Sequence, residues 1–139
     1  TGYRGPAMVA LDHGGQWLKD KQEAIRVAEA EAANSLDKTF SKDELLTAGE
    51  GVYLANCAAC HQANGQGVPP MFPALVDSPV IKGAIEDHIR IVAQGKGAMP
   101  AFGSILSPKD IAAVVTYERN AWGNDQGDLA QPADVANAQ

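Results

Sequence analysis

The sequence predicts an all-α fold of helices and shaped loops. Three observations support this: apolar residues recur at helical spacing in several segments, glycine- and proline-rich loops separate those segments, and good helix formers run through residues 16–35. With 139 residues, the chain is long enough for one domain with its own core and short for two.

The first expected helix covers residues 16–35, because good helix formers run through this segment without proline or glycine. Its apolar stripe is modest and includes Trp17 and Ile25. We interpret it as a solvated connecting helix, with a partner-binding helix as the alternative. Residues 1–15 before it contain a short apolar run, which could be the last strand of a preceding domain.

Ser41 opens the second expected helix, because Ser41 and Glu44 form the pattern of a capping box. This helix continues to the first cysteine. A third helix is expected over residues 81–92, where isoleucines and a valine recur at helical spacing, and it ends at Gly95.

The last expected helix begins at Ser107-Pro108, since proline is favoured at the first helical position. Its apolar face includes Ile111, Val114 and Trp122. The polar segment 124–139 is expected to form a flexible tail.

Residues 57–61 read Cys-Ala-Ala-Cys-His, a run typical of covalent attachment of a c-type haem. Cys57 and Cys60 form thioethers to the haem vinyl groups, and His61 is then an axial ligand of the iron. A zinc site needs about four ligands, but only His13 and His88 remain. A thioredoxin-like redox pair of cysteines requires a βαβ context, and none is visible in this sequence. A structural disulfide between the two cysteines leaves the adjacent histidine unexplained. One covalently bound haem c is therefore the expected cofactor.

Three methionines are candidates for the second iron ligand. Met8 lies outside the predicted haem domain, and Met71 follows His61 by only ten residues, so we interpret Met71 as core packing. Met99 lies in a loop of small residues after a helix, where Pro100 restricts the backbone. We therefore expect Met99 to be the ligand. Because both axial positions are then filled, the site favours electron transfer over catalysis.

Charge and composition exclude some classes of partner. Eleven basic against seventeen acidic residues leave no basic patch for nucleic acid, and no apolar run approaches the ~20 residues of a membrane span. His13 and His88 each have polar neighbours, and we expect both to be solvated surface side chains. Haem attachment of this kind implies an extracytoplasmic, periplasmic location. The chain begins at Thr1 without methionine, and we expect a mature product or a piece of something longer.

Region 41–123 resembles the class I cytochromes c, on four motifs in order: the Cys-x-x-Cys-His run, the loop at 65–70, the Phe-Pro-Ala-Leu run at 72–75, and the methionine loop at 97–102. The resemblance implies a helical domain wrapped around the haem with one edge exposed. Matched residue by residue, it implies that Cys57 and Cys60 are the thioether cysteines. It implies that His61 and Met99 are the two iron ligands, and that the Pro73 carbonyl orients His61.

A closer resemblance is to the haem-bearing C-terminal extension of subunit II of cytochrome c oxidase, on residues 113–124 and 1–20. It implies that the chain starts with the end of a cupredoxin-like copper domain (1–15). Together with the segments described above, this gives three further parts: a helical linker (16–40), the cytochrome c domain (41–123) and the tail (124–139). That family places a copper-ligating histidine and a methionine where this sequence has Tyr3 and Pro6.

The sequence thus favours one-electron transfer by a module that is tethered to a larger redox protein and is not catalytic by itself. Its expected partners are redox proteins, with a copper domain or oxidase subunits of the same complex among them, and a membrane is involved only through the parent protein. A freestanding periplasmic cytochrome c is the first alternative. A haem enzyme or sensor with a displaceable sixth ligand is the second.

Overall fold

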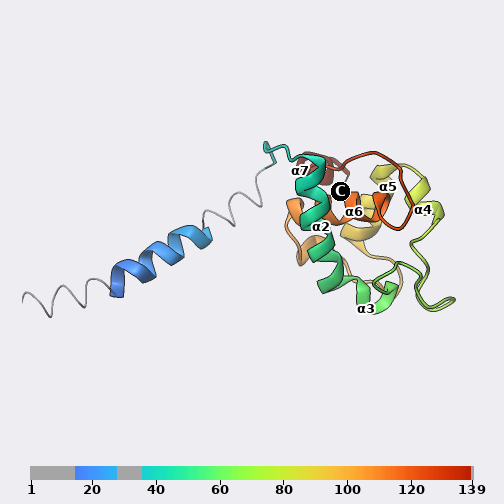
Figure 1. Cartoon of the computed structure of the whole chain (residues 1–139), viewed down its shortest axis with the longest axis horizontal. Coiled ribbons are helices and arrows are strands. Elements are labelled where there is room, and N and C mark those ends of the chain that lie inside the picture. Colours follow the sequence, from blue (N-terminus) through green and yellow to red (C-terminus); the bar gives the residue numbers. More distant parts are fainter. Residues whose placement is uncertain (1–14, 28–35, 139) are drawn as a thin grey trace, which may run out of the picture. The chain divides into compact units, whose positions relative to one another are not determined.

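The computed structural model describes residues 15–27 and 36–138, which belong to two separate units of the chain (Figure 1). In the first unit, residues 15–27 are helical, within the segment expected to be the connecting helix. Trp17, Leu18 and Ile25 are exposed on it, and the Lys21 ammonium group lies 4.8 Å from the centre of the Trp17 ring. Residues 1–14, with the expected end of a preceding domain, lie outside the described residues. No helix in the described ranges is both long and apolar enough to cross a bilayer.

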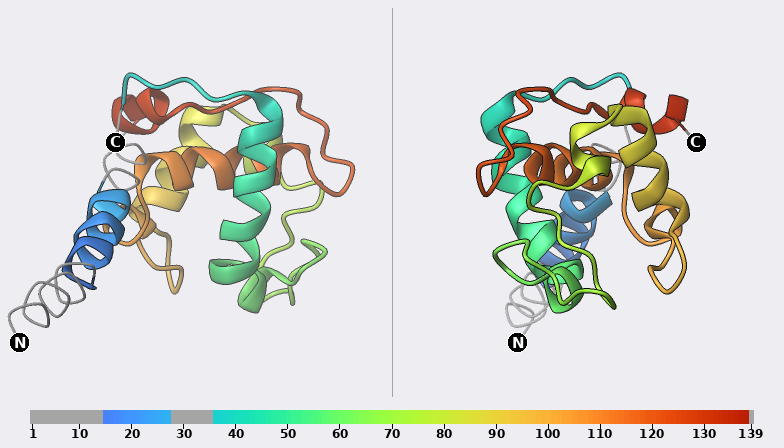
Figure 2. Two further views of the ribbon diagram at one scale, coloured as in Figure 1. Left: turned by 60° about the vertical axis from the view of Figure 1, so that its left-hand side comes forward. Right: turned by 90° about the vertical axis from the view of Figure 1, so that its right-hand side faces the viewer.

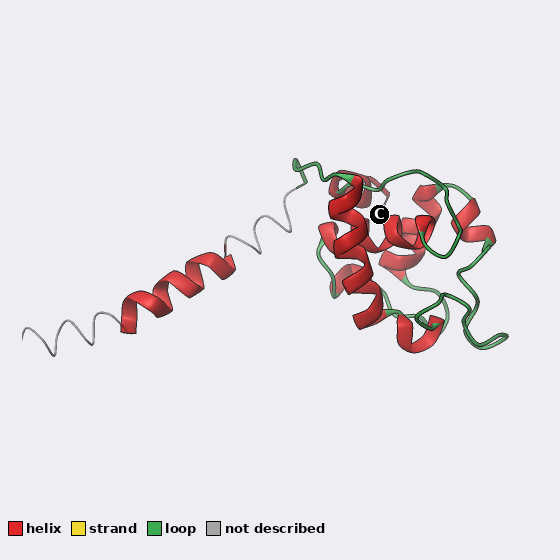
Figure 3. Ribbon diagram, viewed as in Figure 1, coloured by secondary structure: helices red, strands yellow, loops and turns green. Residues whose placement is uncertain are grey.

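The second unit is built from helices and loops, and its described residues contain no β-strand (Figure 3). The all-α class expected from the sequence is therefore confirmed. In chain order its elements are α2 (Lys42–Asn56), α3 (Ala58–His61), α4 (Pro79–Lys82), α5 (Ile85–Gln94), the short 3-10 helix η1 (Phe102–Ser104), α6 (Pro108–Asn120) and α7 (Pro132–Ala138).

The starts of α2 and α6 follow the predicted caps. The Ser41 hydroxyl accepts a hydrogen bond from the Glu44 amide, and the Glu44 carboxylate accepts one from the Ser41 amide, which completes the capping box. At α6 the Ser107 hydroxyl accepts from the Asp110 amide. Side-chain oxygens thus satisfy amide groups that have no partner within the helix.

Helices α2 and α6 cross at the centre of this unit (Figure 2). The crossing is close because Gly49 of α2 faces the backbone of α6: a Cβ at Gly49 would overlap the Ala113 carbonyl oxygen and lie 2.7 Å from the Tyr117 Cβ. Around this contact lie fully buried side chains of both helices, including Leu45 and Val114. The crossing therefore fixes where the cysteine end of α2 lies relative to α6.

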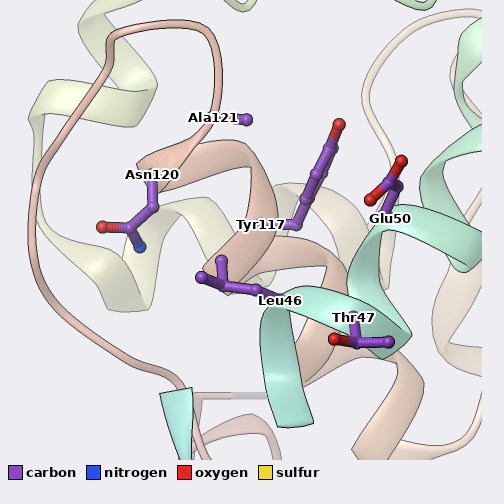
Figure 4. A pocket seen from close by; sticks show the side chains of 6 residues that line it. All are labelled: Leu46, Thr47, Glu50, Tyr117, Asn120 and Ala121. Atoms are coloured by element: carbon purple, nitrogen blue, oxygen red, sulfur yellow. The ribbon is translucent and has the colours of Figure 1, made fainter. Parts of the chain in front are cut away.

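A shallow hollow of about 230 Å³ lies beside the same crossing (Figure 4). It is lined by Leu46, Thr47, Glu50, Tyr117, Asn120 and Ala121. Partial burial, and next the Glu50 carboxylate, raise the pKa of the Tyr117 hydroxyl.

The third expected helix is divided. Residues 79–94 form α4 and α5 with a break at Gly83 and Ala84, whose backbone is extended. The Gly83 carbonyl accepts a hydrogen bond of 2.8 Å from the buried Arg119 guanidinium, so α6 holds the break in place. The division turns α5 so that His88, Ile89 and Val92 are buried.

The C-terminal segment differs from the flexible tail expected for 124–139. Helix α7 buries Val135 and Ala138 against the core, and its carboxyl end accepts a hydrogen bond from Arg90. The Gln131 side chain exchanges two hydrogen bonds of 2.9 Å with the backbone of Phe40. Phe40 is itself buried, so the compact unit extends beyond the expected 41–123 at both ends.

Candidate haem site

The two cysteines and the adjacent histidine lie on one tight turn at the end of α2. Helix α2 ends at Asn56, and the Cys57 carbonyl accepts hydrogen bonds from the amides of Cys60 and His61. Cys57 is buried, Cys60 is exposed, and the two are free thiols with no disulfide between them. Burial, and next the Glu118 carboxylate, raise the pKa of the Cys57 thiol to about 12. The turn presents both sulfur atoms and the imidazole to one cavity.

The His61 ring is held by the carbonyl of Pro73, whose oxygen lies 2.8 Å from Nδ1. A carbonyl oxygen only accepts, so Nδ1 carries the proton and Nε2 keeps its lone pair. Gly67 allows this contact: its φ is +63°, and a Cβ there would lie 2.6 Å from the Pro73 oxygen. The free Nε2 is the atom that can bind a metal.

The loop between His61 and Pro73 is fastened to α2 and to the end of α6. The Tyr53 hydroxyl donates to the Gln62 carbonyl at 2.5 Å, and the Trp122 indole donates to the Ala63 carbonyl at 3.1 Å. Tyr53, Trp122 and Tyr117 also pack as one aromatic cluster, with ring centroids 4.9–5.6 Å apart. Through these two hydrogen bonds the cluster holds the backbone that directly follows His61.

Met99 reaches the same cavity from the loop after α5. It is partly buried against the core, and its backbone exchanges two hydrogen bonds with Lys96. Gly95, with φ +77°, lets the loop fold back on itself, since a Cβ there would lie 2.5 Å from the Met99 oxygen. Met71 also lines the cavity but is 79% exposed, so the core-packing interpretation of Met71 is wrong.

The cavity has a volume of about 570 Å³, and its wall is mostly apolar, with Ile81, Ile91, Val92 and Phe102 among the lining residues. This is the size and character of a site for a large apolar ligand. Two observations fit a haem: two thiols with a histidine lie on one turn, and the imidazole Nε2 is free.

His88 differs from the solvated histidine expected from the sequence. It is only 2% exposed, and its Nε2 lies 2.7 Å from the carboxylate of Glu118, which is 4% exposed. Both residues line the cavity. The sequence carried a signal for this: His88 is spaced three residues after Ile85 and four before Val92, on the apolar face of its helix. His13 lies outside the described residues.

Comparison with known proteins agrees with this geometry. Residues 44–117 match a family model described as cytochrome C oxidase, cbb3-type, subunit III. Cytochrome c6 of Gracilaria tenuistipitata var. liui is 37% identical over 95 residues, which cover 66% of this chain and 84% of that protein. The chain belongs to the class I cytochrome c family. As a class I cytochrome c it carries one covalently bound haem c, through which it transfers electrons.

Other relatives of this class I cytochrome c are subunits of dehydrogenases. The cytochrome c subunit of the quinone alcohol dehydrogenase of Gluconobacter oxydans is 37% identical over 103 residues, or 63% of this chain. The gluconate 2-dehydrogenase cytochrome c subunit of Pantoea cypripedii is 31% identical over 131 residues, or 85% of this chain. The chain spans 21% and 29% of the length of these two subunits.

Proposed function

We propose that this chain is a tethered electron-transfer module of a larger extracytoplasmic redox protein, with His61 and Met99 as the two axial ligands of its haem iron. One observation carries the proposal. The fold brings His61, oriented through Nδ1 by Pro73, and Met99, from a loop 38 residues further on, to the same apolar cavity. These two side chains are the ligand pair that gives a haem a raised reduction potential.

Each site residue has a separate task in this proposal. Cys57 and Cys60 hold the haem by thioethers, and His61 offers Nε2 while Pro73 keeps the ring in one orientation. Met99, which lines the same cavity, offers its thioether sulfur. When bound, the haem supplies a one-electron couple at its iron. The apolar wall excludes water, so the protein contributes attachment, orientation and a low-dielectric environment.

A module with both axial positions filled carries electrons and is not catalytic by itself. A haem enzyme or gas sensor, the alternative, requires a sixth position that exogenous ligands can enter. The test is carbon monoxide binding by the reduced, haem-loaded protein, together with the weak long-wavelength absorption band of sulfur-ligated ferric haem. We expect the band and no carbon monoxide complex. A stable complex without the band would contradict the proposal.

The tethered arrangement is supported by the dehydrogenase subunits, which are several times longer than this chain, and by the helix at 15–27, a unit separate from the haem domain. Oxidase subunits with a copper domain are the partners that the resemblance to subunit II favours. Redox subunits of a dehydrogenase are the second candidate, and a freestanding periplasmic carrier is favoured by the similarity to most of the length of a cytochrome c6.

The gene on the 5′ side of the Thr1 codon distinguishes these arrangements. We expect the upstream sequence to encode, in the same reading frame, a membrane-spanning segment followed by a cupredoxin domain. Further haem-attachment motifs there would favour a dehydrogenase subunit and contradict the oxidase assignment. A secretion signal directly before Thr1 would contradict tethering altogether and favour the freestanding carrier.

A further inference from the structure

Two segments that border the haem cavity carry no charged side chain. Residues 57–76 and 97–108, here called the mouth segments, contain no Asp, Glu, Lys or Arg, although these residues make up 20% of the chain. Each segment supplies residues that are exposed and also line the cavity, Met71 and Pro73 from the first and Ala98 and Pro100 from the second. Because these side chains face both water and the cavity, the mouth segments surround the place where the cavity opens.

Met71 is the most exposed large apolar side chain among the residues that the structure describes. Its exposed fraction is 79%, and that of Val68, three residues before it, is 49%. Exposed apolar side chains that gather next to a functional cavity mark an interaction site. Methionine suits such a site, because its side chain adapts to irregular surfaces and because it is enriched at protein interfaces, whose centres are poor in charged residues.

The backbone holds Met71 in place without a partner. Val68 and Phe72 exchange two backbone hydrogen bonds, of 2.8 and 3.0 Å, and these close a turn with Pro69, Pro70 and Met71 at its tip. Each proline also fixes its own φ. The loop between α3 and α4, which contains this turn, projects from the second unit (Figure 1). Binding through Met71 therefore has little backbone to order, which lowers the entropic cost of association.

The charges near the opening do not favour a charged partner. Lys96 is the one exposed charged side chain that lines the cavity, and it makes no ion pair with another described residue. The acidic residues that give the chain its net charge of −6 all lie outside the mouth segments. An acidic partner would find a single cation here, and a basic partner would find no carboxylate on these segments.

We propose that the mouth segments are the docking face for a redox partner protein whose own contact surface is apolar and uncharged, with the Met71 side chain as the anchor that enters a pocket of that partner. This inference rests on the electron-transfer function proposed above. Electrons pass through the haem, so a partner has to approach the cavity opening, which these segments border. A second copy of this chain fits less well, because it would bring another projecting methionine and a like net charge of −6.

Stopped-flow electron exchange between the haem-loaded protein and a blue copper protein tests this, with a copper protein chosen because an uncharged apolar face covers its metal. One electron passes between the haem iron and the copper ion. Met71→Gln keeps the length of the side chain and adds no charge. We expect it to lower the second-order rate constant about tenfold, because burying a methionine side chain changes a binding constant by about that factor or more.

Leu54→Gln is the matched control, because Leu54 is 51% exposed on α2 and does not line the cavity. Its rate constant should stay within about twofold of wild type, as expected for a side chain outside the contact. Equal rate constants for Met71→Gln and Leu54→Gln would overturn the proposal. So would a larger loss in Lys96→Gln than in Met71→Gln, which would show that docking depends on charge.

Two further measurements separate this proposal from its alternatives. Wild type should sediment as a monomer; a dimer that Met71→Gln dissociates would assign the face to a second copy and overturn the proposal. Hexacyanoferrate, a small complex that needs no docking face, should oxidise reduced wild type, Met71→Gln and Leu54→Gln at similar rates. A haem that hexacyanoferrate does not oxidise would contradict the electron-transfer function. A normal reaction, together with an unchanged rate of exchange between Met71→Gln and the copper protein, would contradict the docking face alone.

Discussion

Replacing Gly49 by alanine has two opposing effects on the free energy of unfolding. Alanine is a better helix former than glycine by about 1 kcal/mol, which favours the folded state. The new methyl group, however, overlaps the Ala113 carbonyl oxygen and lies 2.7 Å from the Tyr117 Cβ. Overpacking of this kind typically costs 1–3 kcal/mol, and the upper end, about 3 kcal/mol, applies here because backbone atoms of a packed helix cannot move aside. We therefore expect a net loss of about 2 kcal/mol in the free energy of unfolding.

Gly51→Ala in the same helix is the matched control, because a Cβ there meets nothing within 4 Å. Gly51→Ala gains the higher helix propensity of alanine without a steric overlap, so it should be more stable than wild type by about 0.5–1 kcal/mol. Thermal unfolding of the haem-loaded proteins, followed by far-ultraviolet circular dichroism, should place Gly49→Ala roughly 10 °C below wild type. Equal midpoints for the two alanine variants would refute the close crossing of α2 and α6.

Three further predictions concern the boundaries and the surface of the domain. Deleting residues 1–38 should leave a cooperatively unfolding, reducible haem domain, because Phe40 and the Ser41 cap are retained; a non-cooperative thermal transition would contradict this. Gln131→Ala should lower the free energy of unfolding by about 2 kcal/mol in urea denaturation, because two hydrogen bonds to Phe40 are lost; an unchanged stability would show that the C-terminal segment does not pack there. The rate constant of electron exchange with a small acceptor cytochrome, measured by stopped flow, should change little with salt, because residues 41–123 hold six basic and eight acidic residues and no basic ring. A fall of about a hundredfold in this rate constant from low to physiological salt would indicate charge-steered docking.

Features that depend on local chemistry were predicted from the sequence. The capping box at Ser41 and the start at Ser107-Pro108 are satisfied within a few residues of chain, and the structure contains both. Pro73 was proposed as the partner of His61 through resemblance, and its carbonyl does lie 2.8 Å from Nδ1. Neighbouring residues, or a loop closed by glycines, determine each of these features.

Features that depend on distant contacts were not predicted. His88 has polar neighbours in sequence, yet its burial depends on Glu118, thirty residues further on. The segment after Gly123 is polar in composition, but Val135 and Ala138 find an apolar surface on α5 and α6 that composition alone does not reveal. The break between α4 and α5 likewise depends on Arg119 of α6.

Carbon monoxide binding by the reduced Met99→Ala variant, with Met71→Ala as the matched control, tests the central claim most directly. Met99 is partly buried against the core and Met71 is 79% exposed, but both line the cavity. We expect Met99→Ala to retain covalent haem through Cys57 and Cys60, to have a lower reduction potential and to bind carbon monoxide, while Met71→Ala behaves as wild type. Carbon monoxide binding by Met71→Ala and not by Met99→Ala would contradict the ligand assignment and the closed electron-transfer site built on it.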